Sequence, residues 1–357
     1  MPSTSMITPR YAAGDLVAFA STLLARAGVR DDIAGEVARV LVDGDLLGHT
    51  THGLALLAPY LAEIEKGAMA KSGEPRVVNA RAAVQAWDGG RLPGPWLTVR
   101  ALESACAMAR DCGTGTVVVR RSHHIACLAA YLTRATDRGM MAIVASSDPA
   151  GKSVAPFGGV GPVFTPNPIA AGIPTSGDPI LLDISASYTT NGLTQRLYEQ
   201  GKKLEHPWIQ DAQGNATADP AVLFNEPKGT LLPLGGLDAG HKGYALALLV
   251  EAVTGALAGF GRADPAEGWG ATVFVQVQDP AAFGGSAGFA RQIDWVADAC
   301  RKTRARPGGD PVRLPGERGM RRLREQSAQG VALFDGIMRS LEPWAAKLHV
   351  ATPKELP

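Results

Sequence analysis

Several features that would assign the chain to a broad class are missing. Its 357 residues include 35 basic and 34 acidic side chains, so a net charge of +1 gives no field to attract nucleic acid or an anionic membrane. The longest apolar stretch, residues 244–260, is interrupted by Glu251 and two glycines and is too polar to span a bilayer. The 4 cysteines show no CxxC spacing, and residues 1–6 show no basic-then-apolar leader pattern. We therefore expect a cytoplasmic protein that binds neither nucleic acid nor membrane.

The common nucleotide-binding loops are also missing. The nearest approach to a Rossmann Gly-x-Gly-x-x-Gly turn is at Gly259 and Gly261, where Asp264 replaces the third glycine and a predicted helix precedes the turn. Gly151-Lys152-Ser153 resembles the end of a phosphate-binding loop, but Ser146 stands where the first glycine of that loop belongs. These motifs leave cofactor use undecided.

Hydrophobic periodicity predicts alternating helices and strands, which is typical of the α/β class, without fixing the strand order. We expect helices over residues 13–43 (two helices separated at Gly28), 54–66, 96–111, 126–137, 243–259 and from about 289 to 348, the last with a break at 307–319. We expect strands over residues 77–78, 84–87, 116–120, 141–146, 170–173, 180–184 and 272–277, and a turn over 210–220.

Four of the 7 histidines fall in two short segments, as the pairs His49 and His52 and His123 and His124. Histidine is the side chain whose ordinary pKa lies nearest neutrality, so it suits proton transfer. His49 and His52 are three residues apart at a predicted helix end, but no cysteine or paired carboxylate is close in sequence to complete a metal site. General acid-base catalysis needs only one well-placed histidine, so we predict proton transfer and no metal.

A third candidate segment is His241-Lys242, which opens a long apolar helix after several glycines. Backbone N–H groups at a helix start, together with a lysine, can hold a phosphate group. A solvated lysine at a helix start is the alternative interpretation.

Taken together, eight motifs in consistent order resemble the second type of malate/L-lactate dehydrogenase family, a non-Rossmann group of nicotinamide-dependent 2-oxoacid and imino-acid reductases. The resemblance covers roughly residues 10 to 345 and rests on the runs 45–53, 122–125, 156–159, 167–168, 182–185, 233–236, 241–244 and 314–317.

The resemblance implies a fold and an assembly. It implies an α/β fold with a non-Rossmann mixed-sheet cofactor domain, of the L-sulfolactate/malate dehydrogenase type, flanked by N- and C-terminal helical lobes. We expect a helical segment over residues 1–75 that carries the catalytic histidine, the cofactor domain over 76–299, and a C-terminal helical segment over 300–357 that packs with the first. A homodimer follows from the resemblance alone.

The resemblance also implies site residues. His52 corresponds to the family's proton donor, with Thr51 in place of the usual serine, while His49 is expected to be a neighbour and not a partner. His124 corresponds to the histidine that orients the substrate, and Thr51, Leu56, His123 and Asn167 are expected to contact it. NAD or NADP is expected at Pro179, Ile180, Leu181, Leu182, Asp183, Ile184, Ser185, His241, Lys242, Gly316, Glu317, Arg318, Gly319, Met320, Arg321 and Arg322.

Three departures from the family pattern bear on the substrate. Leu56 occupies the place where the family often has an arginine that grips a carboxylate, and Leu193 occupies the place of a lysine. Thr165-Pro166 replaces the first half of a Gly-Thr-Asn-Pro motif. An apolar Leu56 favours a bulkier or aromatic substrate side chain, as in the branch that acts on larger hydroxycarboxylates.

We therefore expect an NAD(P)H-dependent oxidoreductase that interconverts a 2-oxoacid and a 2-hydroxyacid, with His52 as general acid and base. A cyclic imino-acid (ketimine) reductase is the enzymatic alternative, since it needs the same hydride and histidine. A catalytically inactive dinucleotide-binding protein is the alternative from another class. The choice between NAD and NADP, the oxoacid, the stereochemistry and the physiological direction stay open.

Overall fold

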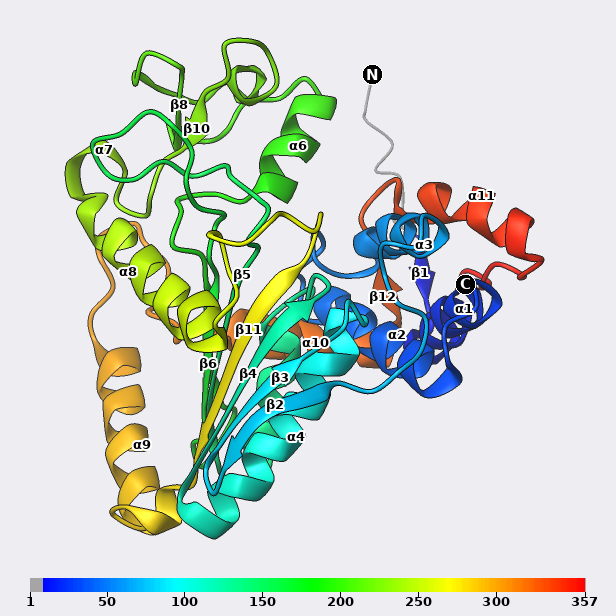
Figure 1. The fold of residues 1–357 in the computed structure, drawn as a ribbon. Helices are drawn as coiled ribbons and strands as arrows, with labels where there is room; N and C mark the ends of the chain where they lie inside the picture. Colours follow the sequence, from blue (N-terminus) through cyan, green and yellow to red (C-terminus); the bar gives the residue numbers. More distant parts are fainter. Residues whose placement is uncertain (1–8, 357) are drawn as a thin grey trace.

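A seven-stranded mixed sheet forms the centre of the molecule in the computed structural model, which describes residues 9–356 (Figure 1). The strand order is β2-β3-β4-β11-β5-β6-β7, with β3 and β4 parallel and every other neighbouring pair antiparallel. This confirms the predicted mixed sheet. The strands are β2 (Arg76–Arg81), β3 (Val84–Asp88), β4 (Thr114–Ser122), β5 (Met141–Ser147), β6 (Ile169–Ile173), β7 (Ile180–Ile184) and β11 (Ala271–Gln278).

Helices cover both faces of this sheet. Alternate residues of β4 point to opposite faces: Val117 and Val119 join the main core beneath α4 (Gly94–Cys112) and α5 (Ala129–Thr136). Val118 joins a second cluster with Val250 and Phe274. That second face is covered by α8 (His241–Glu251) and the π-helical turn η3 (Ala252–Ala256). Helix α9 (Ser286–Lys302) packs beside β6 and β7 (Figure 1).

The N-terminal and C-terminal helices pack together in a helical lobe beside the sheet (Figure 1). The N-terminal part contains α1 (Ala13–Arg26), α2 (Asp31–Leu46), the 3-10 turn η1 (Leu54–Leu56) and α3 (Leu57–Glu65). The C-terminal part contributes α10 (Glu317–Gln329) and α11 (Ile337–Leu348), which pack against α2 and α3 respectively. Strand β1 (Arg10–Tyr11) pairs with β12 (Val331–Ala332), so residues more than 300 positions apart are hydrogen-bonded neighbours.

A smaller subregion lies at one end of the sheet (Figure 1). It has its own apolar cluster, centred on Ile209 and Leu231. Its elements are α6 (Asn191–Glu199), β8 (Ile209–Gln210), β9 (Ala216–Thr217), η2 (Pro220–Leu223), β10 (Thr230–Leu231) and α7 (Gly236–Ala239); the remaining short turn, η4 (Pro280–Ala282), precedes α9.

The predicted helices and strands are present, with corrections to several boundaries. The helix expected over 126–137 begins at Ala129, because Ala126 has φ +59° and residues 125–128 form a loop. The break expected over 307–319 is shorter, since α10 starts at Glu317. The turn expected over 210–220 contains the β8–β9 hairpin, and α6 was not predicted. Helix α9 continues through the expected segment boundary at 299/300 and ends at Lys302.

Among the described residues, none of the helices combines the length and apolarity needed to cross a membrane.

Candidate active site

A cavity of about 470 Å³ opens where the helical lobe, the sheet and the smaller subregion meet. Its wall includes His52 from the turn after α2, His124 from the loop before α5, and Asp183 at the end of β7. The start of α6 and the segment at Trp269 complete the wall. Residues far apart in the sequence thus converge on one cavity.

The turn that carries His52 is fixed by a buried carboxylate. Gly48 has φ +90° and lets the chain leave α2, after which the His52 N–H donates to the His49 carbonyl at 2.8 Å. Asp45, 2% exposed, accepts the Leu54 N–H at 2.7 Å. A Cβ at Gly53 would lie 2.4 Å from the Asp45 carboxyl carbon, so only glycine fits there. Burial raises the pKa of Asp45 to about 7.

His52 is held as a neutral ring in this environment. Its Nδ1 lies 2.8 Å from the Thr51 hydroxyl, which restricts rotation of the ring. Burial is the main cause that lowers its pKa to about 4, and the neighbouring His49 and Arg196 act in the same direction. A neutral imidazole can accept a proton directly, so the resting ring suits general-base catalysis.

His124 has a defined tautomer. The Ala126 N–H, which can only donate, approaches its Nδ1 at 3.3 Å, and the Tyr60 hydroxyl lies 2.9 Å from the same atom. Nδ1 is therefore the acceptor, and the proton of the neutral ring is on Nε2. Burial lowers the pKa of His124 well below its usual range, which keeps the ring neutral. Its ring lies 5.9 Å from that of His52 and 4.8 Å from that of Trp269.

The cavity offers no permanent positive charge among the described residues. No lysine or arginine lines it, whereas Asp148, Asp183 and the apolar Leu56 do. Two arginines lie behind the wall: Arg262 donates to the Thr165 hydroxyl at 3.4 Å, and Arg196 on α6 lies behind the His52 turn. The Arg196 guanidinium donates to the Thr50 carbonyl at 2.8 Å and the Thr50 hydroxyl at 3.0 Å, and stacks 3.7 Å above the Phe334 ring. These contacts hold the guanidinium away from the cavity.

A second cavity of about 460 Å³ adjoins the first. It is lined by residues 181–184 of β7 and by Gly316, Arg318, Gly319 and Arg322, and His49 and Asp183 belong to the walls of both cavities. Gly316 caps the N-terminus of α10 with φ +91°, and a Cβ there would lie 2.8 Å from Leu181. Two guanidiniums beside a close-packed glycine turn fit the phosphates of a dinucleotide. Its reactive end would reach the shared wall.

The predicted site residues divide into two groups. Those that line the cavities are Thr51, His52, Leu56, His124, Leu181, Leu182, Asp183, Ile184, Ser185, Gly316, Arg318, Gly319 and Arg322. Those that line neither are His123, Asn167, Pro179, Ile180, His241, Lys242, Glu317, Met320 and Arg321.

The residues of the second group lie outside both cavities. Asn167 is fully buried, with its amide donating to the Ala247 carbonyl and to Glu251 and its oxygen accepting from Thr165. His123 is also fully buried, packed edge-on against Tyr60. His241 and Lys242 are exposed at the start of α8. Glu317 accepts the Leu314 N–H and pairs with Arg301.

Several cavity residues were not predicted. Tertiary packing brings Asp148, Trp269 and the start of α6 to the site. No sequence motif around them predicts this position. Cys127 was not predicted as a site residue, although it follows His124 closely in the sequence. His49, expected to be a neighbour of His52 only, lines both cavities.

Comparison with known proteins assigns the family. The malate/L-lactate dehydrogenase profile matches residues 11–342. An L-lactate dehydrogenase of Cupriavidus necator is 30% identical over 344 residues, covering 94% of this chain and 96% of that protein. The malate dehydrogenase structure of Entamoeba histolytica has a TM-score of 0.91 at 25% identity, covering 98% of this chain and 100% of that one. A Δ1-piperideine-2-carboxylate reductase structure from Pseudomonas syringae pathovar tomato has a TM-score of 0.81 at 25% identity, covering 95% and 100%.

The fold and these cavities therefore define an enzyme of the oxidoreductase class. The chain belongs to the malate/L-lactate dehydrogenase family, and its malate and L-lactate dehydrogenase relatives support an NAD(P)-dependent 2-hydroxyacid oxidoreductase.

Proposed function

We propose that this chain interconverts a 2-oxoacid and a 2-hydroxyacid with an apolar side chain, and that His52 exchanges the proton. The observation that carries the proposal is the pairing of two neutral histidines, His52 and His124, on the wall of a cavity that adjoins a second one lined by arginines. The substrate that exchanges a proton and the cofactor that exchanges a hydride must lie side by side, and the two adjoining cavities allow this. A bound nicotinamide cofactor supplies or accepts the hydride at the substrate carbon.

His52 acts in both directions. In oxidation, its neutral ring removes the hydroxyl proton of the substrate as the carbonyl forms. In reduction, the imidazolium donates that proton to the developing oxyanion, and a substrate carboxylate beside the ring favours the imidazolium by opposite charge. The Thr51 hydroxyl contacts Nδ1, which leaves Nε2 as the ring atom that would exchange the proton.

His124 supports the same step as a hydrogen-bond donor. Its Nε2 carries the proton, so it can donate to the substrate oxygen without itself becoming charged. Tyr60 fixes the ring from behind through contacts to Nδ1 and to the His124 carbonyl at 3.0 Å. Leu181, Asp183, Gly316, Arg318 and Arg322 would hold the cofactor in the second cavity.

The charge of the cavity selects the substrate class. A second carboxylate or a sulfonate on the substrate would enter a space without lysine or arginine and with Asp148 and Asp183 in its wall. Such a group would lose hydration without gaining a charged partner. Leu56 and Trp269 instead offer apolar contact, so we expect monoanionic oxoacids with aliphatic or aromatic side chains.

The test replaces His52 by alanine and measures NADH- and NADPH-dependent reduction of phenylpyruvate. Loss of the proton donor should lower kcat by about 10²–10⁴-fold. Binding of the dinucleotide, followed by its effect on the melting temperature, should be retained. His206→Ala is the matched control, because that histidine is exposed. Unchanged turnover in His52→Ala would contradict the mechanism.

A cyclic imino-acid reductase is the second candidate, favoured by the similarity to the Δ1-piperideine-2-carboxylate reductase structure. In this reaction, His52 would give its proton to the imine nitrogen of the substrate instead of to a carbonyl oxygen. Assaying cyclic imino acids beside phenylpyruvate with the same enzyme preparation separates the two.

We also propose a cytoplasmic homodimer. The outer face of α8 and the following turn exposes Leu248, Leu249 and Leu257, with Leu257 61% exposed. Exposed apolar side chains gathered on one helix are typical of an interface between subunits. Sedimentation of the purified protein measures the assembly.

A further inference from the structure

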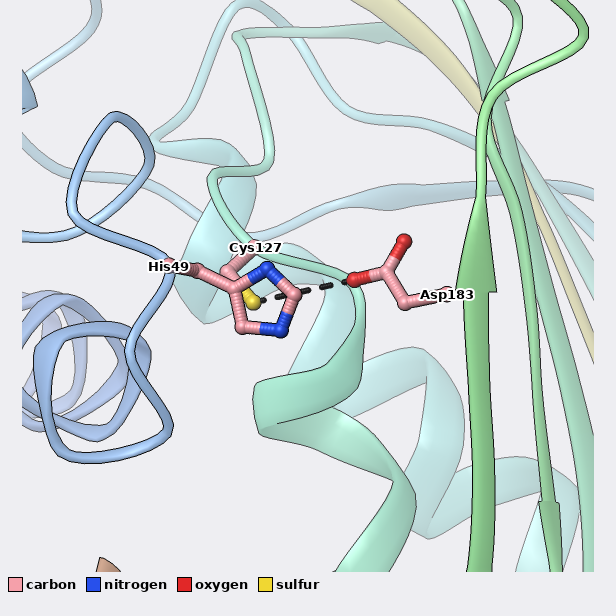
Figure 2. A group of neighbouring side chains, drawn as sticks. All are labelled: His49, Cys127 and Asp183. Carbon is pink, nitrogen blue, oxygen red and sulfur yellow. Dashed lines mark hydrogen bonds between the residues drawn. The ribbon is translucent and has the colours of Figure 1, made fainter. Parts of the chain in front are cut away.

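A cluster of three side chains takes no part in the proposed proton transfer: His49, Cys127 and Asp183. They come from three elements: the turn after α2, the loop before α5, and β7 (Figure 2). A ring nitrogen, the thiol sulfur and a carboxylate oxygen of these residues all lie within 4.8 Å of one another. Figure 2 shows the three side chains directed toward a common point, with the thiol donating to Asp183 Oδ2 at 3.7 Å.

The spacing is close to that of a tetrahedral metal site. Zinc bonds of about 2.0 Å to nitrogen and oxygen and about 2.3 Å to sulfur place neighbouring ligand atoms roughly 3.3–3.7 Å apart. The cluster would therefore contract by about 1 Å. His49 can supply that movement, because it follows Gly48, is half-buried, and lies in a turn and not in a helix.

The donor set identifies the ion. A thiolate and a carboxylate carry two negative charges, which balance a divalent cation in a partly buried place, and the imidazole binds as a neutral ligand. Thiolate and imidazole favour zinc over magnesium or calcium, which prefer oxygen ligands. Three protein ligands leave the fourth position of zinc open toward the cavities.

We propose that His49, Cys127 and Asp183 bind a zinc ion at the junction of the two cavities, and that this ion inhibits the enzyme by excluding the cofactor. Binding forms a bond between zinc and Cys127 Sγ and releases the thiol proton to solvent, while Asp183 exchanges the thiol hydrogen bond for the metal. His49 and Asp183 line both cavities, so an ion bound to them occupies the place where the reactive end of the dinucleotide must lie. Sequence reasoning predicted no metal because these three residues are distant in the chain.

The direct test uses Co²⁺ as a spectroscopic substitute for zinc in the full-length protein. A thiolate-to-cobalt charge-transfer band in the near ultraviolet is expected, and Zn²⁺ should abolish it by displacement. The band should be absent in Cys127→Ser and retained in Cys112→Ser, since Cys112 is exposed at the end of α4. His49→Asn gives a second variant on the exposed side of the cluster and should weaken cobalt binding. A missing band in the wild type, or a band that survives in Cys127→Ser, overturns the proposal.

Measurement of NADH binding tests the inhibition. This part of the test rests on the proposed function. At a Zn²⁺ concentration ten times its dissociation constant, competition should raise the apparent Kd for NADH about 11-fold in the wild type and leave it nearly unchanged in Cys127→Ser. An NADH affinity that does not respond to zinc, beside a clear cobalt band, overturns the inhibitory role. Failure to bind NADH without any metal counts against the proposed function, whereas the cobalt band still decides the metal site.

Discussion

Placing a cation at position 56 should redirect the enzyme toward dianionic substrates. Leu56 lines the cavity four residues after His52, and no lysine or arginine among the described residues offsets Asp148 and Asp183 there. A guanidinium at this place could bind a second substrate carboxylate through two parallel hydrogen bonds. Hydrogen bonds to charged groups contribute about 1.5–3 kcal/mol, which corresponds to roughly 10- to 150-fold in kcat/KM.

The assay compares kcat/KM for oxaloacetate and for phenylpyruvate in the wild type and in Leu56→Arg. We expect the ratio of the two values to shift toward oxaloacetate by that factor, while the apolar substrate loses contact with the leucine side chain. Leu56→Met is the matched control, because it keeps the approximate volume of the side chain without the charge. If Leu56→Arg and Leu56→Met give the same ratio, the charge of the cavity does not select the substrate and the reasoning fails.

Two further predictions concern the turn that carries His52. Arg196→Gln removes a positive charge near His52, so the pKa of His52 should rise from about 4. Because oxidation needs the neutral ring, the acid limb of the pH profile of kcat/KM should then move to higher pH. Arg196→Lys keeps the charge and should leave the limb in place; a limb that stays put in the glutamine variant contradicts the assignment. Gly53→Ala should lower the free energy of unfolding by about 1–3 kcal/mol, measured in urea, because its Cβ meets the Asp45 carboxylate. Gly14→Ala, where no atom lies within 4 Å, should instead stabilise α1 by about 0.5–1 kcal/mol.

The parts of the site that were predicted are those that local sequence carries. His52 and His124 each sit in a short motif whose turn is built by near neighbours, such as Gly48 and Ala126. The sheet strands were predicted from short apolar runs bounded by turn residues, which are also local features of the sequence.

The parts that were missed depend on distant packing. Trp269 reaches the cavity from a loop more than 140 residues beyond His124, next to which its ring lies. Helix α6 is short and begins with Asn191 and Gly192, both poor helix formers, so tertiary contacts must stabilise it. His241 and Lys242 had the local pattern of a phosphate site, yet the fold exposes them away from both cavities.

The contacts between α10 and α2 have a consequence for how the enzyme matures. Gln326 donates to the Asp45 and Leu46 carbonyls at 2.9 and 3.0 Å, across 281 and 280 residues of chain, and Phe334 lies beneath the Arg196 guanidinium. At synthesis rates of roughly 5–20 residues per second, the His52 turn leaves the ribosome on the order of 15–60 s before these partners exist. During synthesis, the N-terminal helices therefore lack the C-terminal contacts that support the His52 turn. Activity should appear only after the last fifty residues have packed against these helices.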